Sequence, residues 1–347
     1  MKATFQKASV TPVATLSAES LQRARATVED FVRSYFPLHG LPLDAFLNFM
    51  DVLIFIEASL YECDERVEAE VEHGKTEKAD EVAGVRDALA SAARKDPVFS
   101  ELLSFLEAQG LLDDAVATEL ACGLAYWQLE QKIGELGSDV AVCIEEVQKA
   151  MRRKSFDYRV LNLVLYQLQE VPYDHAMLDF LCEAELLVEI EDDLKDYSKD
   201  VLRKSFNIYR CYVHAYGEQA PARMASFIEA VEASYLAKRS VALNKEQLQQ
   251  HIARNEEQQS AGPAMAPCNG CWAIPVPILD EPRTRMLASA CDGVLPPLFV
   301  KASAGGASEL SSSRRHRSRS PRISLPGRAA HSQLTQACTV TGVGGEK

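Results

Sequence analysis

The spacing of apolar residues constrains this chain more than any other feature of its sequence. Over residues 17–258, apolar side chains recur every three or four positions, with Ala, Leu, Glu, Lys and Gln between them. This period gathers the apolar side chains on one face of an α-helix, whereas a strand alternates every two residues. Turn-forming residues such as Gly40, Gly110 and Pro172 interrupt the period. The sequence therefore predicts an all-α, single-domain helical bundle over residues 17–258.

The sequence changes character at both ends of this region. Residues 1–16 show no sustained period, and we interpret them as a flexible N-terminus. After residue 258 the chain becomes rich in Pro, Gly, Ser and Ala, and the helical period stops. We therefore expect residues 259–347 to form a low-complexity, disordered C-terminal tail.

The balance of charge argues against one class of function. The chain has 37 Lys and Arg against 50 Asp and Glu, a formal net charge of -13, so we do not expect the helical body to bind nucleic acid. The tail differs, because residues 301–347 carry eight Lys and Arg against two Glu, including an Arg/Ser-rich run at 311–322. An RNA-associated role for the tail therefore stays open as an alternative.

The sequence also predicts where the protein resides. The most apolar run, residues 45–60, contains Asp51 and Glu57, which indicates a buried helix and no transmembrane segment. Nine cysteines at wide and irregular spacing fit a reducing compartment. We expect a cytoplasmic protein. Residues 1–18 contain several Ser and Thr and no acid, which makes the plastid the alternative.

One expected helix, over residues 43–72, carries an apolar stripe that becomes acidic at its C-terminal end. Asp64 and Glu68 lie one helical turn apart on this stripe, with Glu65 beside them. Two carboxylates at this spacing can reach the same cation. The end of this helix is therefore a candidate metal site.

A second expected helix, from about residue 174 to residue 200, repeats this plan. Asp192, Asp196 and Asp200 follow one another at four-residue spacing on a face that is apolar at its start. Apolar residues surround the first half of this helix on nearly all sides, which predicts a central helix whose acidic end opens onto water or a cavity. The face opposite the carboxylates is predicted to lie in the core, and it contains Ile190, Leu194, Tyr197 and Val201.

The two acidic stripes need neutralisation only if they are buried. Carboxylates one turn apart repel each other by about 3 kcal/mol at an effective dielectric constant of about 20, but by less than about 1 kcal/mol in water. A solvated acidic face is therefore the simple alternative. If the stripes lie at the mouth of a cavity, hard oxygen ligands at this spacing suit Mg²⁺.

The second stripe resembles a known motif. Asp192-Asp-Leu-Lys-Asp-Tyr-Ser-Lys-Asp200 is similar to the second metal-binding motif of class I terpene synthases, members of the isoprenoid synthase family. Asp196 stands where that family usually has a hydroxyl residue, and Asp200 is shorter than the usual Glu. Asp64-Glu-Arg-Val-Glu68 resembles the first motif of the family, with Glu65 as the departure, and the separation of the two motifs is of the expected size.

The resemblance implies a fold of the isoprenoid synthase type and an enzyme that ionises an allylic prenyl diphosphate with the help of Mg²⁺. Carried over to this sequence, it implies the metal ligands Asp64, Glu65, Glu68, Asp192, Asp196 and Asp200. Lys199 resembles a diphosphate-contacting residue of the family, and Arg152 or Arg153 stands roughly where the family has a diphosphate-sensing Arg. Asn207-Ile-Tyr209 resembles a further element downstream.

Several alternatives stay open at this point. The Arg-Tyr pair of microbial enzymes has no counterpart after the second motif, so a non-catalytic helical interaction protein on the same fold is one alternative. A relative of the head-to-head prenyl synthases is another. Chain-elongating enzymes are disfavoured, because residues 67–73 lack the paired Arg that follows the first motif in that group. Asp113 and Asp114, which follow Gly110, predict a helix N-cap and no metal site.

Overall fold

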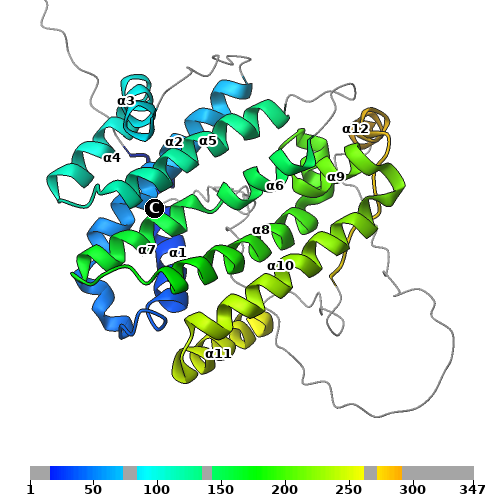
Figure 1. The fold of residues 1–347 in the computed structure, drawn as a ribbon. Helices are drawn as coiled ribbons and strands as arrows, with labels where there is room; N and C mark the ends of the chain where they lie inside the picture. Colours follow the sequence, from blue (N-terminus) through cyan, green and yellow to red (C-terminus); the bar gives the residue numbers. More distant parts are fainter. Residues whose placement is uncertain (1–15, 73–83, 135–142, 262–271, 291–347) are drawn as a thin grey trace, which may run out of the picture.

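The fold is taken from a computed structural model, in which the described residues are 16–72, 84–134, 143–261 and 272–290. The regular structure of these residues is helical, without a β-strand, which confirms the predicted all-α fold (Figure 1). No helix within these ranges is both long and apolar enough to cross a membrane. The predicted flexible residues 1–15 and the tail residues 291–347 lie outside the described residues.

The described helices fall into two halves of the chain. The first half contains α1 (Ala18–Tyr35), the 3-10 helix η1 (Leu43–Asn48), α2 (Met50–Glu72), α3 (Val85–Lys95), α4 (Pro97–Ala108) and α5 (Asp114–Gly134). The second half contains α6 (Ile144–Arg153), α7 (Phe156–Leu168), α8 (His175–Arg203), α9 (Ile208–Tyr216), the 3-10 helix η2 (Gly217–Gln219), α10 (Ala220–Ala242), α11 (Lys245–Ala261) and α12 (Glu281–Ala290).

Short polar side chains fix where several of these helices begin. Asp113 Oδ1 accepts a hydrogen bond of 2.9 Å from the backbone N–H of Val116, so the predicted N-cap before α5 is confirmed. Asp174 Oδ1 accepts a hydrogen bond of 3.0 Å from the N–H of Met177 and begins α8 in the same way. These caps satisfy backbone donors that have no partner within the helix.

The expected single helix over residues 43–72 is instead two elements. Residues Leu43–Asn48 form η1, and the α-helix begins only at Met50. None of the η1 residues is buried, and Leu43 and Leu47 are largely exposed. Because η1 has no buried face, core packing does not extend the α-helix through this segment. The apolar part of the predicted stripe therefore starts later than expected.

Helix α8 is the central helix of the body, as the sequence predicted. It contacts α6, α7, α9, α10 and α12, and in Figure 1 it lies between α6–α7 on one side and α10 on the other. The predicted inward face is buried, and it comprises Ile190, Leu194, Tyr197 and Val201. One hydrophobic core extends from Val28 in α1 to Ile274, which lies between α11 and α12. The acidic end of α8 is thereby held inside the bundle.

A close approach of α5 to α7 sets the position of two aromatic rings. A Cβ atom at Gly123 would lie 2.3 Å from the ring of Phe156, so only glycine allows this packing. The Phe156 ring stands edge-on to Trp127 of α5, with ring centroids 5.4 Å apart. The start of α7 is therefore pressed against α5.

Part of the predicted disordered tail is ordered, which corrects the expectation from composition. Residues 272–290, here called the strap, fold back onto α8 and α9. The hydroxyl of Tyr209 donates to the carbonyl of Pro275 at 2.6 Å, and the N–H of Ile278 donates to the hydroxyl of Tyr197 at 2.8 Å. Ile274 is buried in the core. The sequence of the first half of the strap has no helical period. Hydrogen bonds with the buried residues Tyr197 and Tyr209 hold this half in place.

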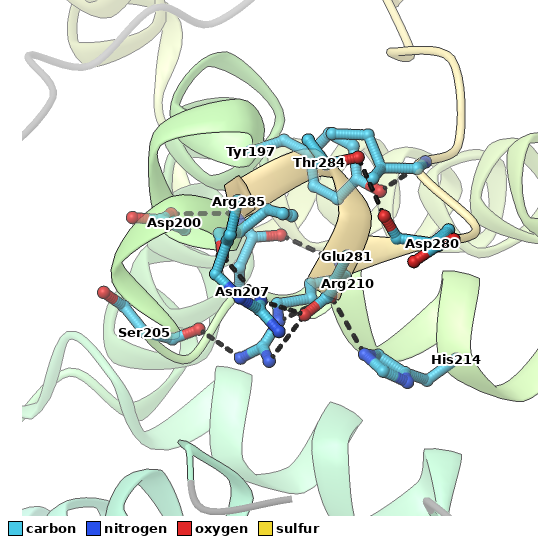
Figure 2. A network of polar contacts seen from close by, with 12 residues as sticks. Tyr197, Asp200, Ser205, Asn207, Arg210, His214, Asp280, Glu281, Thr284 and Arg285 are labelled. Atoms are coloured by element: carbon cyan, nitrogen blue, oxygen red, sulfur yellow. Dashed lines mark hydrogen bonds and ion pairs between the residues drawn. The ribbon is translucent and has the colours of Figure 1, made fainter. Parts of the chain in front are cut away.

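A buried ion network fastens the other half of the strap (Figure 2). Glu281 at the start of α12 accepts from Arg210 Nε at 2.8 Å and from Arg210 Nη2 at 2.9 Å. His214 Nε2 and Arg285 Nη1 contact the same carboxylate at 2.9 Å and 2.8 Å. Burial acts to raise the pKa of Glu281, but hydrogen bonds from His214, Arg210 and Arg285 outweigh it and hold that pKa well below its usual range.

Candidate functional site

The second acidic motif surrounds a lysine that comes from the break between two helices. Helix α6 ends at Arg153 and α7 begins at Phe156. Lys154, in this break, places its Nζ 2.6 Å from Asp193 Oδ1 and 3.0 Å from Glu189 Oε2. We call Lys154, Ser155, Glu189 and Asp193 the lysine centre. One lysine of the α6–α7 break therefore serves two buried carboxylates at the acidic end of α8.

Each carboxylate oxygen of the lysine centre has a partner. The hydroxyl of Ser155 donates to Glu189 Oε1 at 2.6 Å, and the backbone N–H of Ile208 donates to Asp193 Oδ2 at 2.7 Å. The second of these contacts ties the start of α9 to α8. The centre thus connects the α6–α7 break, α8 and α9 at one point.

Asn207 joins the same two helices a second time. Its Oδ1 accepts from the N–H of Arg210 at 3.0 Å and caps α9, while its Nδ2 donates to Asp193 O at 2.6 Å and to Asp200 Oδ2 at 2.9 Å. Figure 2 shows Asn207 between Asp200 and the strap network. The strap therefore supports Arg210 and, through the α9 cap, the acidic end of α8.

Three of the carboxylates of α8 outside the lysine centre belong to the second acidic motif. Asp192, Asp196 and Asp200 are partly exposed and form what we call the outer stripe. Burial, followed by the neighbouring Glu189, raises the pKa of Asp192 to about 7. Burial also raises the pKa of Asp200 to about 7, with Asp193 and Asp196 adding to the effect. Within the ranges that the structure describes, no three His, Cys, Asp or Glu side chains gather closely enough to hold a metal ion by themselves.

These raised pKa values predict a pH dependence of stability in metal-free buffer. Because the folded-state pKa of Asp200 is about 7 and the unfolded value is about 4, the folded state binds more protons between these values. The contribution of Asp200 to stability is therefore present below pH 4 and is lost as the pH rises through 7. We expect Asp200→Asn to unfold at a temperature that falls less than that of the wild type between pH 5 and pH 8.

The control for this measurement is Asp179→Asn, which changes an exposed carboxylate on the same helix. Thermal unfolding followed by circular dichroism provides the readout, and the relevant quantity is the difference between wild type and variant at each pH. Parallel melting curves for wild type and Asp200→Asn across this range would contradict the prediction.

The first acidic motif, on α2, is divided between two neighbours. Asp64 Oδ1 accepts from the indole N–H of Trp127 at 2.8 Å, whereas Glu65 turns to α1 and pairs with Arg23 at 2.6 Å. The side chain of Glu68 lies outside the described residues. Asp64 is thus the described member of this motif that turns toward α5.

The two motifs are connected through the aromatic pair between α5 and α7. Asp64 contacts Trp127, Trp127 packs against Phe156, and Phe156 follows Ser155, which binds Glu189. Among the contacts of the described residues, none joins Asp64 directly to a carboxylate of α8. The structure therefore relates the two motifs through three intervening residues, Trp127, Phe156 and Ser155.

The predicted diphosphate-contacting residues have other partners in this structure. Arg152 Nη1 lies 3.2 Å from Glu183, a residue that also pairs with Lys238 of α10 at 2.9 Å. Arg153 contributes its carbonyl, which accepts from Arg159 at 3.1 Å. Lys199 runs along its own helix, with Nζ 3.3 Å from Asp196 Oδ2, and is the predicted basic residue that lies beside the outer stripe.

Sequence reasoning missed two basic residues that pair with buried carboxylates of α8, Lys154 and Arg159. Arg159 Nε lies 2.8 Å from Glu119 and its Nη1 lies 3.4 Å from Glu185, so it neutralises the middle of α8 as Lys154 neutralises its end. A signal was present, because Arg159 directly precedes a run of apolar residues in α7. A charged side chain on a buried helix must be paired.

Glu185 carries a further polar atom into the core. Its Oε1 accepts no hydrogen bond from the described residues, while its Oε2 faces Arg159. Burial raises the pKa of Glu185 to about 8, although Arg159 acts against this rise.

Comparison of the chain with models of protein families, with curated proteins and with solved structures gives no match in any of the three. The features of the chain that bear on its function are therefore the lysine centre, the outer stripe and the acidic motifs of the sequence.

Proposed function

We propose that this chain is a Mg²⁺-dependent, terpene synthase-like enzyme that ionises an allylic prenyl diphosphate. The observation that carries the proposal is the surplus of carboxylates at the end of α8. Lys154 serves Glu189 and Asp193 together, and the outer stripe adds three partly buried carboxylates, of which Asp192 faces Lys195 at 3.8 Å and Asp196 faces Lys199 at 3.3 Å. Burial raises the pKa values of Asp192 and Asp200, and a cation beside them would offset the cost of their charged forms.

The outer stripe fits Mg²⁺ by the chemistry of its donors. Its ligands are carboxylate oxygens, which are the hard donors that Mg²⁺ prefers, and they follow one another at one-turn spacing. Mg²⁺ usually keeps several waters and binds through one or two carboxylates plus phosphate oxygens of a substrate. A site that is completed only by a diphosphate therefore agrees with the absence of a three-ligand group among the described residues.

In this proposal, Asp192, Asp196 and Asp200 would supply carboxylates to Mg²⁺, one or two to each ion, and Lys199 adds a positive charge at the same edge. When bound, Mg²⁺ supplies electrophilic stabilisation of the departing diphosphate. Asn207 keeps Asp200 in position through its hydrogen bond of 2.9 Å. The product is diphosphate and a carbocation that is cyclised or quenched.

The rings of the core supply the second requirement, protection of a carbocation from water. Phe31, Tyr35 and Tyr158 form a buried cluster between α1 and α7, with centroid separations of 4.8 Å to 6.2 Å. Aromatic faces stabilise a cation by about 0.5 to 2 kcal/mol each.

A second candidate function is favoured by one observation. Lys154 already pairs with two buried carboxylates at the acidic end of α8, which is what a helical interaction protein without catalysis would need for stability. In that case the outer stripe is a solvated acidic face, and the chain binds no diphosphate.

Diphosphate release distinguishes these candidates. Purified full-length protein is incubated with geranyl, farnesyl or geranylgeranyl diphosphate, with Mg²⁺ or with EDTA, and released inorganic pyrophosphate and extracted hydrocarbons are measured. We expect Mg²⁺-dependent release with at least one substrate. Asp192→Asn and Asp200→Asn are expected to slow it on the order of 10- to 100-fold, as loss of a metal contact does.

The matched control is Asp179→Asn, an exposed carboxylate earlier on α8, which should retain the wild-type rate. Absence of release with all three substrates, together with unchanged heats on titration with Mg²⁺ and pyrophosphate, would favour the non-catalytic protein. Equal rates for the stripe variants and the control would remove the outer stripe from the mechanism.

A further inference from the structure

Lys154 holds the position where the acidic end of α8 is most buried. Glu189 and Asp193 are 5% and 3% exposed, and the ammonium of Lys154 contacts both of them. These two carboxylates stand at i and i+4 on α8, which is the same spacing as that within the outer stripe. The lysine centre thus has the ligand pattern of a cation site, with an ammonium as its cation.

We propose that Lys154 is a built-in cation that fills the inner of two cation positions on α8 and thereby restricts divalent metal to the outer stripe. The metal on the outer stripe rests on the proposed function, whereas the occupation of the inner position by Lys154 rests on the contacts above. In this view residue 154 determines how many divalent cations the helix takes.

The geometry explains why a lysine performs this role. The ammonium is a compact charge with three donors, so one Nζ can serve two carboxylates at 2.6 Å and 3.0 Å. Its stem is anchored, because Lys154 caps the end of α6 and the next residue, Ser155, binds Glu189 itself. The remaining oxygen of Asp193 is held by the N–H of Ile208. The carboxylates are therefore kept in place for a cation independently of the lysine head group.

Removal of the ammonium should convert the lysine centre into a metal site. In Lys154→Met, two buried carboxylates face each other without a counter-charge, and their repulsion is relieved by a divalent cation. We expect this variant to bind one Mn²⁺ more than the wild type, or to bind Mn²⁺ on the order of tenfold more tightly.

The experiment titrates full-length protein with Mn²⁺ alone and counts bound ions by electron paramagnetic resonance. Lys238→Met is the matched control, because Lys238 also pairs with a buried carboxylate of α8, Glu183 at 2.9 Å, and Arg152 keeps that carboxylate paired. This control should bind Mn²⁺ as the wild type does. The triple variant Lys154→Met/Glu189→Gln/Asp193→Asn removes the carboxylates as well and should lose the gain.

The same number and affinity of bound Mn²⁺ in Lys154→Met and wild type would overturn the inference, as would a gain that persists in the triple variant. If Lys154→Met is unfolded in metal-free buffer, recovery of its helical circular dichroism on addition of Mn²⁺ supports the inference, and no recovery overturns it. Failure of the proposed function is seen separately, as absence of Mg²⁺-dependent pyrophosphate release by the wild type.

Discussion

Glu281→Gln is expected to lower the free energy of unfolding by about 3–5 kcal/mol, because it breaks a buried ion pair and leaves its partner charged. Glu281 and Arg210 are each 5% exposed, and their two contacts are 2.8 Å and 2.9 Å long. Gln has nearly the same shape but no charge, so Arg210 keeps a buried positive charge with weaker partners. In the variant the strap should then detach at a lower denaturant concentration than it does in the wild type.

Denaturant unfolding followed by circular dichroism measures this effect. Glu29→Gln is the control, since Glu29 pairs with Arg33 on the surface of α1, and it should change stability by less than about 1 kcal/mol. A loss for Glu281→Gln that is no larger than that of the control would show that the strap contributes little.

Two truncations test the strap as a unit. A chain ending at residue 261 lacks the strap, whereas a chain ending at residue 290 keeps it. We expect the shorter chain to lose at least as much stability as Glu281→Gln and the longer chain to retain its stability. Similar losses in the two truncations would place the effect in residues 291–347.

The pH dependence of the Glu281→Gln effect has a definite sign. The pKa of Glu281 is held below its usual range, so its contribution to stability is present above the unfolded pKa of about 4. That contribution is lost as the pH falls through the folded-state pKa. The difference between wild type and variant is therefore expected to be largest near neutral pH and to shrink in acid.

Arg159→Met is expected to lower the free energy of unfolding by about 3–5 kcal/mol, because it too breaks a buried ion pair. Arg159 serves Glu119, Glu185 and the carbonyl of Arg153, and Met fills a similar volume without any of these donors. Arg86→Met removes the exposed pair with Asp114 and is the control, with an expected change below about 0.5 kcal/mol.

The effect of Arg159→Met should grow above about pH 8. Burial raises the pKa of Glu185 to about 8 while Arg159 is present, and loss of the guanidinium raises that pKa further. The variant then keeps a proton that its unfolded state has released, so its stability falls with rising pH. Combining Arg159→Met with Glu185→Gln should restore part of the loss, and additive losses in this double-mutant cycle would contradict the coupling.

The sequence by itself determined the helical class, the central position of α8 and several helix starts. The apolar period of α8 predicted that Leu194, Tyr197 and Val201 are buried, and Asp113 predicted the cap of α5. These features depend on residues within one or two turns of each other, so they can be read along the chain. The acidic face of α8 was visible for the same reason.

The tertiary structure alone decided which basic residue faces that acidic face. Four basic residues lie between positions 152 and 159, and the helix break at Lys154 and Ser155 brings Lys154 to Glu189 and Asp193 while Arg152 turns to Glu183. The direction of a side chain at such a break depends on the helices packed against it, which no local period records.

The ordered conformation of the strap also depends on tertiary contacts. Its contacts join Tyr209 to Pro275, Arg210 to Glu281 and Tyr197 to Ile278, across 66, 71 and 81 residues of sequence. Composition predicted disorder for this segment because it contains few apolar residues at regular spacing. What orders it is a set of buried hydrogen bonds and one ion network, in which most partners of the strap lie on α8 and α9 and only Arg285 pairs with Glu281 from within the segment.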